Sequence, residues 1–454
     1  MKPVLTLVAC LAIGACTTSE TSRRASPDIA LPPMKTFSSV AVRAPAKSNA
    51  RIARDFLDLA FTLENGAKMP RFTRFEGPIT VRVTGPAPAS LSPDLDRLLA
   101  RLRREASIPI SRVAADRDAS ITIAPVPRSQ IQSAAPSAAC FVRPNVSSWD
   151  EYRARRNDPG TYWNRLTDRS RMTVFLPRDV SPQEVRDCLH EEIAQALGPV
   201  NDIYRLSDSI FNDDNFHTVL TGFDMLILRA YYDPALQNGM SEAQVTALLP
   251  GILNRLNPRG RSGHVSAGER GTGAWETQIT TATTPRTSRT RRLAAAERAV
   301  QLAQRFGPND PRLAFSYYIL GRLALTSSPE TALVSFLQAG KIYQGRPDTR
   351  IQEAHVAMQV AAFQLSAGRA DVAINLVDQN LRTVTDAEHA ALLSLLLMVK
   401  AEALELMNRP GEARRIQNEA LAWARYGYGS DAEVRDRVSE ILAISPRTRQ
   451  RGPA

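Results

Sequence analysis

Small side chains recur at a spacing of about forty residues in the C-terminal third of the chain. Ala332, Ala373 and Ala413 follow one another at intervals of 41 and 40 residues in a helical, Ala- and Leu-rich stretch. Further small residues stand about twelve positions upstream of each: Gly321, Ala361 and Ala401. Small residues let two helix backbones approach closely, so a fixed period of them predicts stacked helix pairs over residues 293–445.

This repeat resembles the tetratricopeptide repeat, with a unit slightly longer than the usual one. The aromatic positions are only partly filled, so generic helical hairpins remain the alternative. Stacks of this kind form extended concave surfaces that bind peptides or proteins. The resemblance therefore implies protein partners for residues 293–445.

The N-terminus has the pattern of an export signal. Residues 1–15 contain one lysine and an apolar run that is too short to span a bilayer. The run ends in Ile-Gly-Ala before Cys16, which resembles the bacterial lipobox and implies that Cys16 is acylated and anchors the chain in a membrane. An ordinary secretory signal is the alternative. We expect a periplasm-facing protein of the bacterial cell envelope, and Thr17 in place of Asp slightly favours the outer membrane.

Between the two ends, folded and low-complexity segments alternate. Residues 16–47 are rich in Thr, Ser, Pro and Ala and predict a flexible tether. Residues 48–257 mix helix and strand periodicity and predict one α+β domain. Residues 258–292, rich in Arg, Thr and Gly, predict a disordered linker, and residues 446–454 a basic disordered tail. Strand-like runs in the α+β domain occupy 78–83, 108–113, 120–126, 140–143 and 172–176.

The formal net charge of +11 is concentrated in the segments predicted to be disordered. Residues 293–445 carry 16 basic and 17 acidic side chains, whereas 258–292 carry 7 and 2, and 446–454 carry 3 and none. Folded domains that are close to neutral, in an exported chain, argue against a nucleic-acid partner. Binding of anionic polymers through arginine remains a separate alternative, and it would weaken steeply with salt.

Cys140 and Cys188 are the only cysteines beyond Cys16. Export would bring both into an oxidising compartment, so we expect a disulfide between them, with two buried free thiols as the alternative. The cysteines lack the C-x-x-C spacing of a zinc site, which excludes a cysteine zinc site.

The segment most suggestive of chemistry is a predicted helix over 182–197 that ends at Gly198. Its His190-Glu191 pair fails the zinc motif H-E-x-x-H because position 194 is alanine. Shifted by one residue, the segment resembles the long metzincin peptidase pattern. That resemblance places Glu191, Gln195 and Asn201 at the three metal-ligand positions and Glu192 at the position of the general base.

Glu192 has two interpretations. Helical geometry places it at the edge of the apolar face, where burial raises the pKa of a carboxyl group, as in a general base. A structural carboxylate bonded to buried backbone amides fits the same position. Oxygen donors at Glu191, Gln195 and Asn201 make a poor zinc site but suit calcium or magnesium, with Asp202 nearby. We therefore expect no cofactor, with an unconventional divalent metal as the alternative.

The same region also resembles a family of uncharacterised bacterial lipoproteins, domain of unknown function 2927, over about residues 50–256. Besides Glu191 and Glu192, the resemblance rests on a downstream set of residues: Asp202, Ser209, Phe211, Asn212, Asp213, Asp224, Tyr232, Asp233 and Pro234. The activity of that family is unknown. The resemblance therefore implies a fold and an envelope location but no reaction.

The expected architecture is an α+β zincin-like domain followed by an all-α tetratricopeptide-like helical repeat domain. Because the histidine ligands are replaced, we expect an inactive first domain within a lipid-anchored scaffold or interaction module. Its partners would be the membrane, through Cys16, and other envelope proteins, through the repeats. The alternative is a metal-dependent hydrolase of peptide or peptidoglycan that uses Glu192 as its general base.

Overall fold

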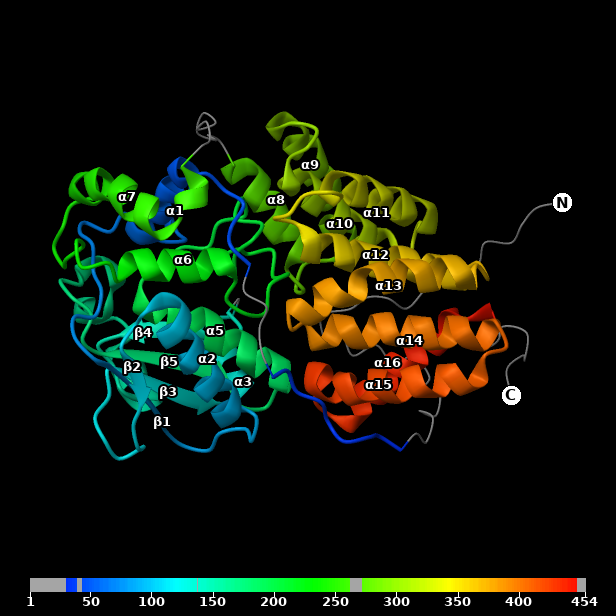
Figure 1. Cartoon of the computed structure of the whole chain (residues 1–454), viewed down its shortest axis with the longest axis horizontal. Helices are drawn as coiled ribbons and strands as arrows, with labels where there is room; N and C mark the ends of the chain where they lie inside the picture. The colour runs from blue at the N-terminus through cyan, green and yellow to red at the C-terminus, as the bar shows by residue number, and fades with distance from the viewer. Residues whose placement is uncertain (1–29, 39–42, 137, 262–271, 447–454) are drawn as a thin grey trace. The chain divides into compact units, whose positions relative to one another are not determined.

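The computed structural model describes residues 30–38, 43–136, 138–261 and 272–446, which form two compact units (Figure 1). The α/β unit lies within residues 41–267, and the helical unit lies within 268–454 and includes the N-terminal segment up to residue 40. The predicted signal peptide 1–15, the lipidation site Cys16 and nearly all of the tail 446–454 lie outside the described residues. None of the described helices combines the length and the hydropathy that a membrane crossing needs.

The α/β unit is built on a mixed five-stranded sheet. Its strands are β1 (Ile79–Val83), β2 (Ile110–Arg112), β3 (Ile121–Val126), β4 (Phe141–Pro144) and β5 (Met172–Pro177). Their order is β2-β1-β3-β5-β4, and every neighbouring pair is parallel except β4, which runs antiparallel to β5 at one edge. β3 and β5 are buried along their whole length, as expected for central parallel strands. The five predicted strand-like runs are confirmed.

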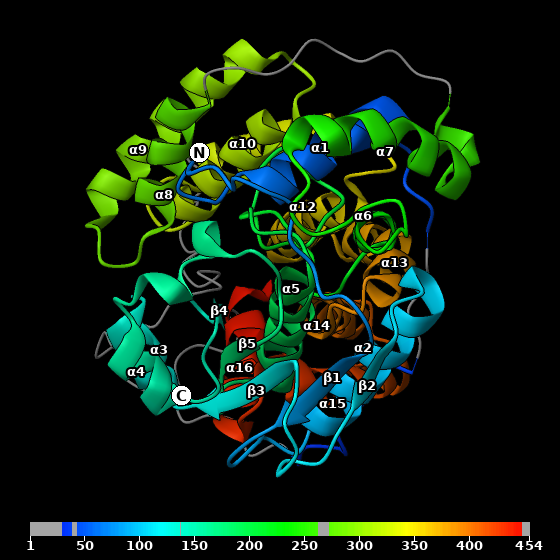
Figure 2. The ribbon, with the colours of Figure 1, turned by 90° about the vertical axis from the view of Figure 1, so that its left-hand side faces the viewer.

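In the described part of this unit, seven helices accompany the sheet: α1 (Asn49–Phe61), α2 (Leu91–Ala106), α3 (Arg128–Ala134), α4 (Trp149–Arg155), α5 (Pro182–Leu197), α6 (Gly222–Tyr231) and α7 (Glu242–Leu256). Short 3-10 turns occupy Pro159–Thr161, Trp163–Arg165 and Pro258–Gly260. α2 and α5 pack side by side, α2 against β2 and α5 against β4 and β5 (Figure 2). The apolar side of α5 enters the core through Leu189 and Ile193, which are fully buried. This packing fixes which side of α5 faces the edge strand β4.

The helical unit contains nine helices among the described residues: α8 (Gly273–Thr283), α9 (Arg289–Ala303), α10 (Pro311–Ala324), α11 (Pro329–Tyr343), α12 (Arg350–Ser366), α13 (Ala370–Asp386), α14 (Ala390–Leu406), α15 (Pro410–Tyr428) and α16 (Asp431–Ile444). A 3-10 turn follows α9 at Gln304–Phe306. Consecutive helices from α8 to α15 pack as four pairs, and α16 lies against α14 and α15. The first helices of the last three pairs begin at Pro311, Arg350 and Ala390, at intervals of 39 and 40 residues.

The small residues of the period lie where these helices meet. Ala332 and Ala373 are fully buried, and a Cβ atom on Gly321 would lie only 2.8 Å from the Phe336 ring. In the last pair, a Cβ atom on Gly427 would lie 2.6 Å from the backbone of Ala391. The predicted role of small side chains in close helix packing is confirmed.

The predicted disordered linker 258–292 differs from the structure. α8 lies within it and α9 begins in it, so helices start about twenty residues before the predicted boundary at 293. Trp275, Ile279 and Ala282 form the buried side of α8, and the indole N–H of Trp275 donates to the Ser316 hydroxyl (2.8 Å). These three residues are spaced for one helix side but are separated by Glu, Thr and Gln. Their burial becomes apparent only once α9 and α10 provide the packing surface.

The predicted flexible tether also differs from the structure in its second half. Residues 30–38, which we call the docked segment, lie against α15. Phe37 is only 5% exposed and stacks on Trp423, with ring centroids 4.3 Å apart. The backbone N–H of Lys35 donates to the carbonyl oxygen of Ala422 (3.1 Å). Low-complexity composition predicts flexibility only when no distant surface buries the few apolar residues in the segment.

Replacing Phe37 with alanine is expected to release the docked segment. Burying a Phe side chain stabilises a contact by roughly 1.5–3 kcal/mol, so the undocked population should rise about ten- to a hundredfold. Limited trypsin digestion of the full chain should then cleave after Lys35 faster by a similar factor. Met34, which is 40% exposed, provides the control, because Met34→Ala should leave the rate unchanged. Equal cleavage rates in wild type and Phe37→Ala would contradict the docking.

Candidate functional site

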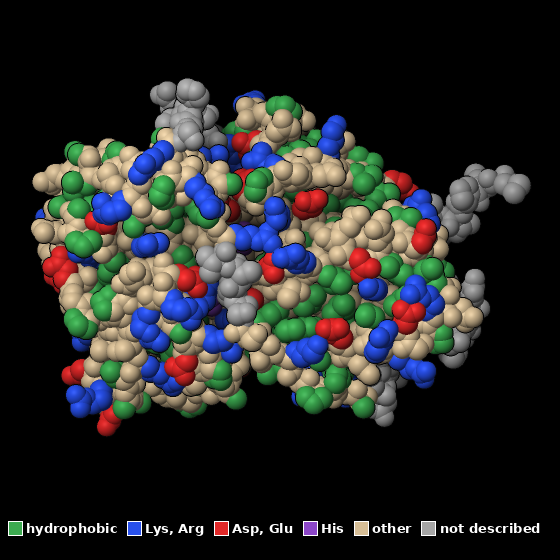
Figure 3. All heavy atoms as spheres, viewed as in Figure 1, with side chains coloured by type: hydrophobic (Ala, Val, Ile, Leu, Met, Phe, Trp, Pro, Cys, Tyr) green, Lys and Arg blue, Asp and Glu red, His purple; other side chains and the backbone are tan. Residues whose placement is uncertain are grey.

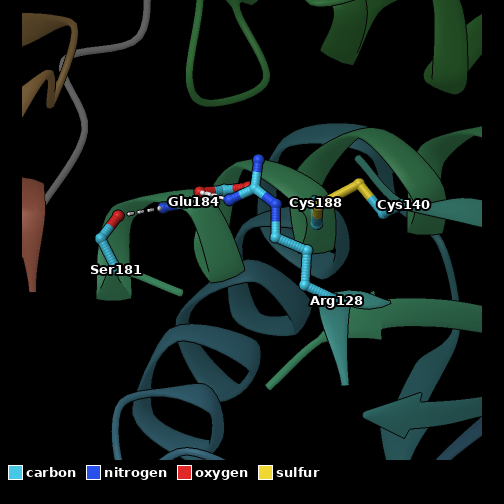
Figure 4. Close-up of a disulfide and its surroundings, with 5 residues drawn as sticks. All are labelled: Arg128, Cys140, Ser181, Glu184 and Cys188. Carbon is cyan, nitrogen blue, oxygen red and sulfur yellow. Dashed lines mark hydrogen bonds and ion pairs between the residues drawn. A yellow bond between two sulfur atoms is a disulfide. The ribbon is translucent and has the colours of Figure 1, made fainter. Parts of the chain in front are cut away.

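α5 carries the residues that the sequence singled out, and its N-terminus has the predicted cap. The Ser181 hydroxyl accepts a hydrogen bond from the backbone N–H of Glu184 (3.1 Å), and Pro182 occupies the first helical position (Figure 4). The Glu184 carboxylate forms an ion pair with Arg128 (3.2 Å). The start of α5 is therefore positioned by local sequence.

The C-terminus of α5 is held by a residue that sequence reasoning missed. Arg169 is 3% exposed and donates to the carbonyl oxygens of Gln195 (2.6 Å), Ala196 (2.9 Å) and Gly198. A cation at this end offsets the partial negative charge of the helix terminus. Burial lowers the pKa of the Arg169 guanidinium. No local pattern marks this role, because Arg169 lies in the loop before β5 and reaches α5 only through the fold.

Cys140 and Cys188 form the predicted disulfide, with a sulfur–sulfur distance of 2.07 Å and Cα atoms 5.9 Å apart (Figure 4). The bond joins the residue that precedes β4 to the middle of α5. It therefore fixes the edge strand next to the turn of α5 that carries Glu191 and Glu192. The expected disulfide is therefore present, and the alternative of two buried free thiols is wrong.

Glu191 and Glu192 meet at this junction. One carboxylate oxygen of each lies within 4.8 Å of the other and of the Cys140 sulfur. Glu192 is 3% exposed and accepts a hydrogen bond from the backbone N–H of Val142 in β4. Its Oε2 atom has no hydrogen-bond partner among the residues that the structure describes. Of the two interpretations of Glu192, this geometry matches the structural carboxylate bonded to a buried backbone amide.

The carboxyl groups around Glu191 repel one another. Burial, followed by the charges of Glu64 and Asp213, raises the pKa of Glu191 to about 7. For both Glu192 and Asp202, burial is the main cause that raises the pKa well above the usual range, and the charge of Glu191 is the second. Within the described part of the chain, no positive charge is among those acting on these three groups. Burial and mutual repulsion therefore both favour the protonated forms of these three carboxyl groups.

The other two predicted ligands are engaged in hydrogen bonds through their amide nitrogens. Gln195 donates to Oδ2 of Asp202 (3.2 Å), and Asn201 donates to the backbone carbonyl of Asp58 (3.2 Å). Through Gln195, the structure ties Asp202, which the sequence placed only nearby, to the same helix as Glu191 and Glu192.

Zinc does not fit this donor set. Cys140 is committed to the disulfide, and the remaining donors are carboxyl and amide oxygens, whereas zinc prefers imidazole and thiolate. The nearest histidine in sequence, His190, accepts a hydrogen bond at Nδ1 from the backbone N–H of Leu220 (3.1 Å) and is 4% exposed. Burial is the main cause that lowers the pKa of His190 well below the usual value, and the positive charges of nearby arginines add to it. His190 therefore serves as a neutral acceptor in the core.

Asp224 is the centre of the downstream motif. It is fully buried, and its carboxylate accepts hydrogen bonds from the Ser209 hydroxyl and from the backbone N–H groups of Ile210 (3.1 Å) and Thr221 (2.7 Å). The Thr221 hydroxyl in turn accepts from the Asp224 N–H, which completes a capping box at the start of α6. Asp224 thus joins the loop after α5 to α6.

The other downstream motif residues also bond within the unit. The Asn212 side chain donates to the Leu206 carbonyl (3.1 Å), and the Tyr232 hydroxyl donates to the Leu197 carbonyl (3.0 Å). Phe211 is fully buried in the core. Asp233 accepts from the Ala235 N–H (3.0 Å), and Pro234 is the exposed residue between them. Among the downstream motif residues, Asp213 differs, because its negative charge helps to raise the pKa of Glu191.

Comparison with known proteins gives one match. Residues 49–251 match a family described as "Protein of unknown function (DUF2927)", which confirms the resemblance over the α/β unit. The chain matches no curated protein and no solved structure. The matched range ends within α7 and assigns no reaction to the carboxyl cluster.

Proposed function

We propose that this protein, whose α/β unit matches the unknown-function family, is a lipid-anchored scaffold that binds other cell-envelope proteins through its helical unit. In this proposal the α/β unit is a zincin-like domain that has lost its catalytic metal, and the helical unit is a tetratricopeptide-like array. The lipobox-like sequence before Cys16 supports the anchor and the envelope location.

The docked segment is the observation that carries this proposal. The helical unit binds an extended piece of chain from 384 residues away in sequence, through an ion pair between Lys35 and Glu419 (3.0 Å). The Arg425 side chain donates to the carbonyl oxygen of Pro32 (2.9 Å), and Phe37 also meets Tyr426 edge to face. Backbone hydrogen bonds combined with one buried aromatic anchor are a common means of binding extended peptides. A surface built in this way is suited to hold segments of other proteins.

A second apolar surface lies on α11. Val334 is 57% exposed and Leu337 is 52% exposed, and their spacing of three residues places both on one side of the helix. Large apolar side chains exposed side by side are typical of protein contact sites. We assign this pair to partner binding.

The geometry around Glu192 supports an inactive α/β unit. A general base must come within hydrogen-bond reach of its substrate or of a water molecule. Glu192 is 97% buried, and the disulfide holds β4 against α5 beside it. Figure 3 shows Lys and Arg side chains scattered among Asp and Glu on the face viewed, which favours protein partners over an anionic polymer.

The test is capture of partners by the full chain in the envelope. Replacing Val334 and Leu337 together with glutamate should reduce crosslinked partners at least tenfold, because charge replaces the apolar contact while the exposed positions leave the fold intact. Arg382→Glu on α13, where the side chain is 90% exposed, provides the matched control and should retain capture. Undiminished capture by the folded double variant would contradict the assignment of this surface. Peptide or peptidoglycan hydrolysis that disappears in Glu192→Gln would instead establish the hydrolase alternative.

A further inference from the structure

The docked segment carries a short sequence pattern of its own. Residues 32–37 read Pro-Pro-Met-Lys-Thr-Phe, with a basic and an aromatic residue two positions apart. Each proline restricts its own backbone and that of the residue before it to extended conformations. The segment therefore loses little conformational freedom when it binds, an advantage that proline-rich ligands of aromatic-lined surfaces share.

The basic and the aromatic residue each have a matching contact on α15. The Trp423 ring stacks on Phe37 and also lies 5.6 Å from the Lys35 ammonium group, which is a cation–π distance. Glu419, one turn earlier on the helix, forms an ion pair with the same ammonium group (3.0 Å). A single side of α15 thus recognises both the charge and the ring.

Two further side chains near the C-terminal end of α15 complete this surface. The Arg425 guanidinium donates to the Pro32 carbonyl oxygen (2.9 Å) and is paired with Asp431 at the start of α16 (3.8 Å). The Tyr426 ring is fully buried and meets Phe37 edge to face. A buried ring and a donor that is held by its own ion pair need little reorganisation to accept a segment.

The docked segment itself is held by few contacts. Among residues 30–38 only Phe37 is buried, and the ion pair of Lys35 with Glu419 is about half exposed, so it contributes little. A segment that belongs to the same chain can stay bound despite weak intrinsic affinity, because attachment raises its effective concentration toward the millimolar range. A free segment with the same pattern can therefore displace it.

We infer that this surface of α15 is a binding site for partner segments of the pattern Pro-Pro-x-Lys-x-aromatic, and that the docked segment competes with them. The partner would be an extended, proline-rich segment of another envelope protein, which places a basic side chain on Glu419 and an aromatic ring on Trp423. The docked segment then restricts the site to partners that bind tightly enough to displace it. This inference rests on the proposed scaffold function, for which it names the partner class.

The experiment titrates the full chain into a fluorescent peptide of residues 30–38 and follows the anisotropy of the peptide. Phe37→Ala in the chain releases the docked segment and raises the fraction of competent sites. The apparent dissociation constant should therefore be about ten- to a hundredfold lower for this variant than for the parent. A peptide that itself carries Phe37→Ala should bind the variant chain at least tenfold more weakly than the original peptide.

A charge exchange tests the position of the bound peptide. Adding Glu419→Lys to the Phe37→Ala chain should weaken binding of the original peptide about two- to fivefold, and a Lys35→Glu peptide should prefer the exchanged chain by a similar factor. Glu412→Lys is the matched control, because Glu412 lies on the same helix, is equally exposed (44%) and pairs with Arg409 (2.6 Å). This control should leave the affinity for the original peptide unchanged.

The inference is overturned if the Phe37→Ala chain shows no saturable binding up to about 5 mM, because a segment that docks needs a dissociation constant below its effective concentration. Equal affinities of the parent and the Phe37→Ala chain would overturn the competition. A parent chain that sediments as a dimer, and that the peptide separates into monomers, would identify a second copy as the occupant and overturn it too. The titrations use no partner protein, so this inference can fail while the chain still captures envelope proteins, and the reverse.

Discussion

Replacing Arg169 with methionine is expected to lower the free energy of unfolding of the α/β unit by about 3–5 kcal/mol, because three buried carbonyl oxygens lose their donor. The carbonyl oxygens of Gln195, Ala196 and Gly198 would lose their shared donor at the C-terminus of α5. Each buried acceptor without a partner costs about 1–3 kcal/mol. Urea unfolding, followed by hydrogen exchange of α5 peptides, measures the loss.

Arg171→Met is the matched control for this prediction. The Arg171 side chain is 43% exposed, and its ion pair with Glu151 (3.2 Å) is accessible to solvent. Such a pair contributes less than about 1 kcal/mol. If Arg169→Met were no more destabilising than Arg171→Met, the end of α5 would not depend on the buried guanidinium.

Removing the disulfide through Cys140→Ala together with Cys188→Ala is expected to destabilise the α/β unit by about 4 kcal/mol. That value follows from the 48-residue separation, because the cross-link restricts the unfolded chain in proportion to the logarithm of the loop length. For a unit of this size, the thermal midpoint should fall by roughly 8–16 °C. Differential scanning calorimetry of the full chain measures it.

Reduction of the parent protein provides the control. A dithiol reductant should lower the midpoint of the α/β unit by the same amount and should leave the double variant unaffected. The helical unit should keep its midpoint in both cases, since no cysteine follows Cys188 in the sequence. Identical midpoints for the oxidised and reduced parent would show that the bond does not stabilise the fold.

The candidate site illustrates how far sequence can predict geometry. Helical periodicity predicted that Glu192 lies at the edge of the apolar face of α5, whereas the structure buries it almost completely, at 3% exposed. Periodicity could not decide between a general base and a structural carboxylate, because that depends on Val142 in the edge strand. Asp202 contacts α5 because the chain turns after Gly198 and the Gln195 amide donates to its carboxylate. Both contacts follow from tertiary packing.

The charge distribution needs a similar correction. The excess of arginine in residues 258–292 predicted disorder, yet Arg289, Arg291 and Arg292 belong to α9. The Arg292 guanidinium donates to the Ala282 carbonyl of α8 (2.8 Å), so part of that positive charge belongs to a folded helix pair. Amino-acid composition could not show that this segment folds into helices, because only three residues of α8 are buried.

Local sequence is enough to specify three features: the capped helix from Ser181 to Gly198, the strand runs of the sheet, and the forty-residue period of helix pairs. Caps, alternation and helical spacing depend on residues a few positions apart, so they can be read from the chain. Long-range packing specifies the others: Phe37 stacks on Trp423, Arg169 bonds to the end of α5, and Glu192 accepts from Val142. Those contacts join residues far apart in sequence, and the choice of partner depends on which surfaces the whole fold buries together.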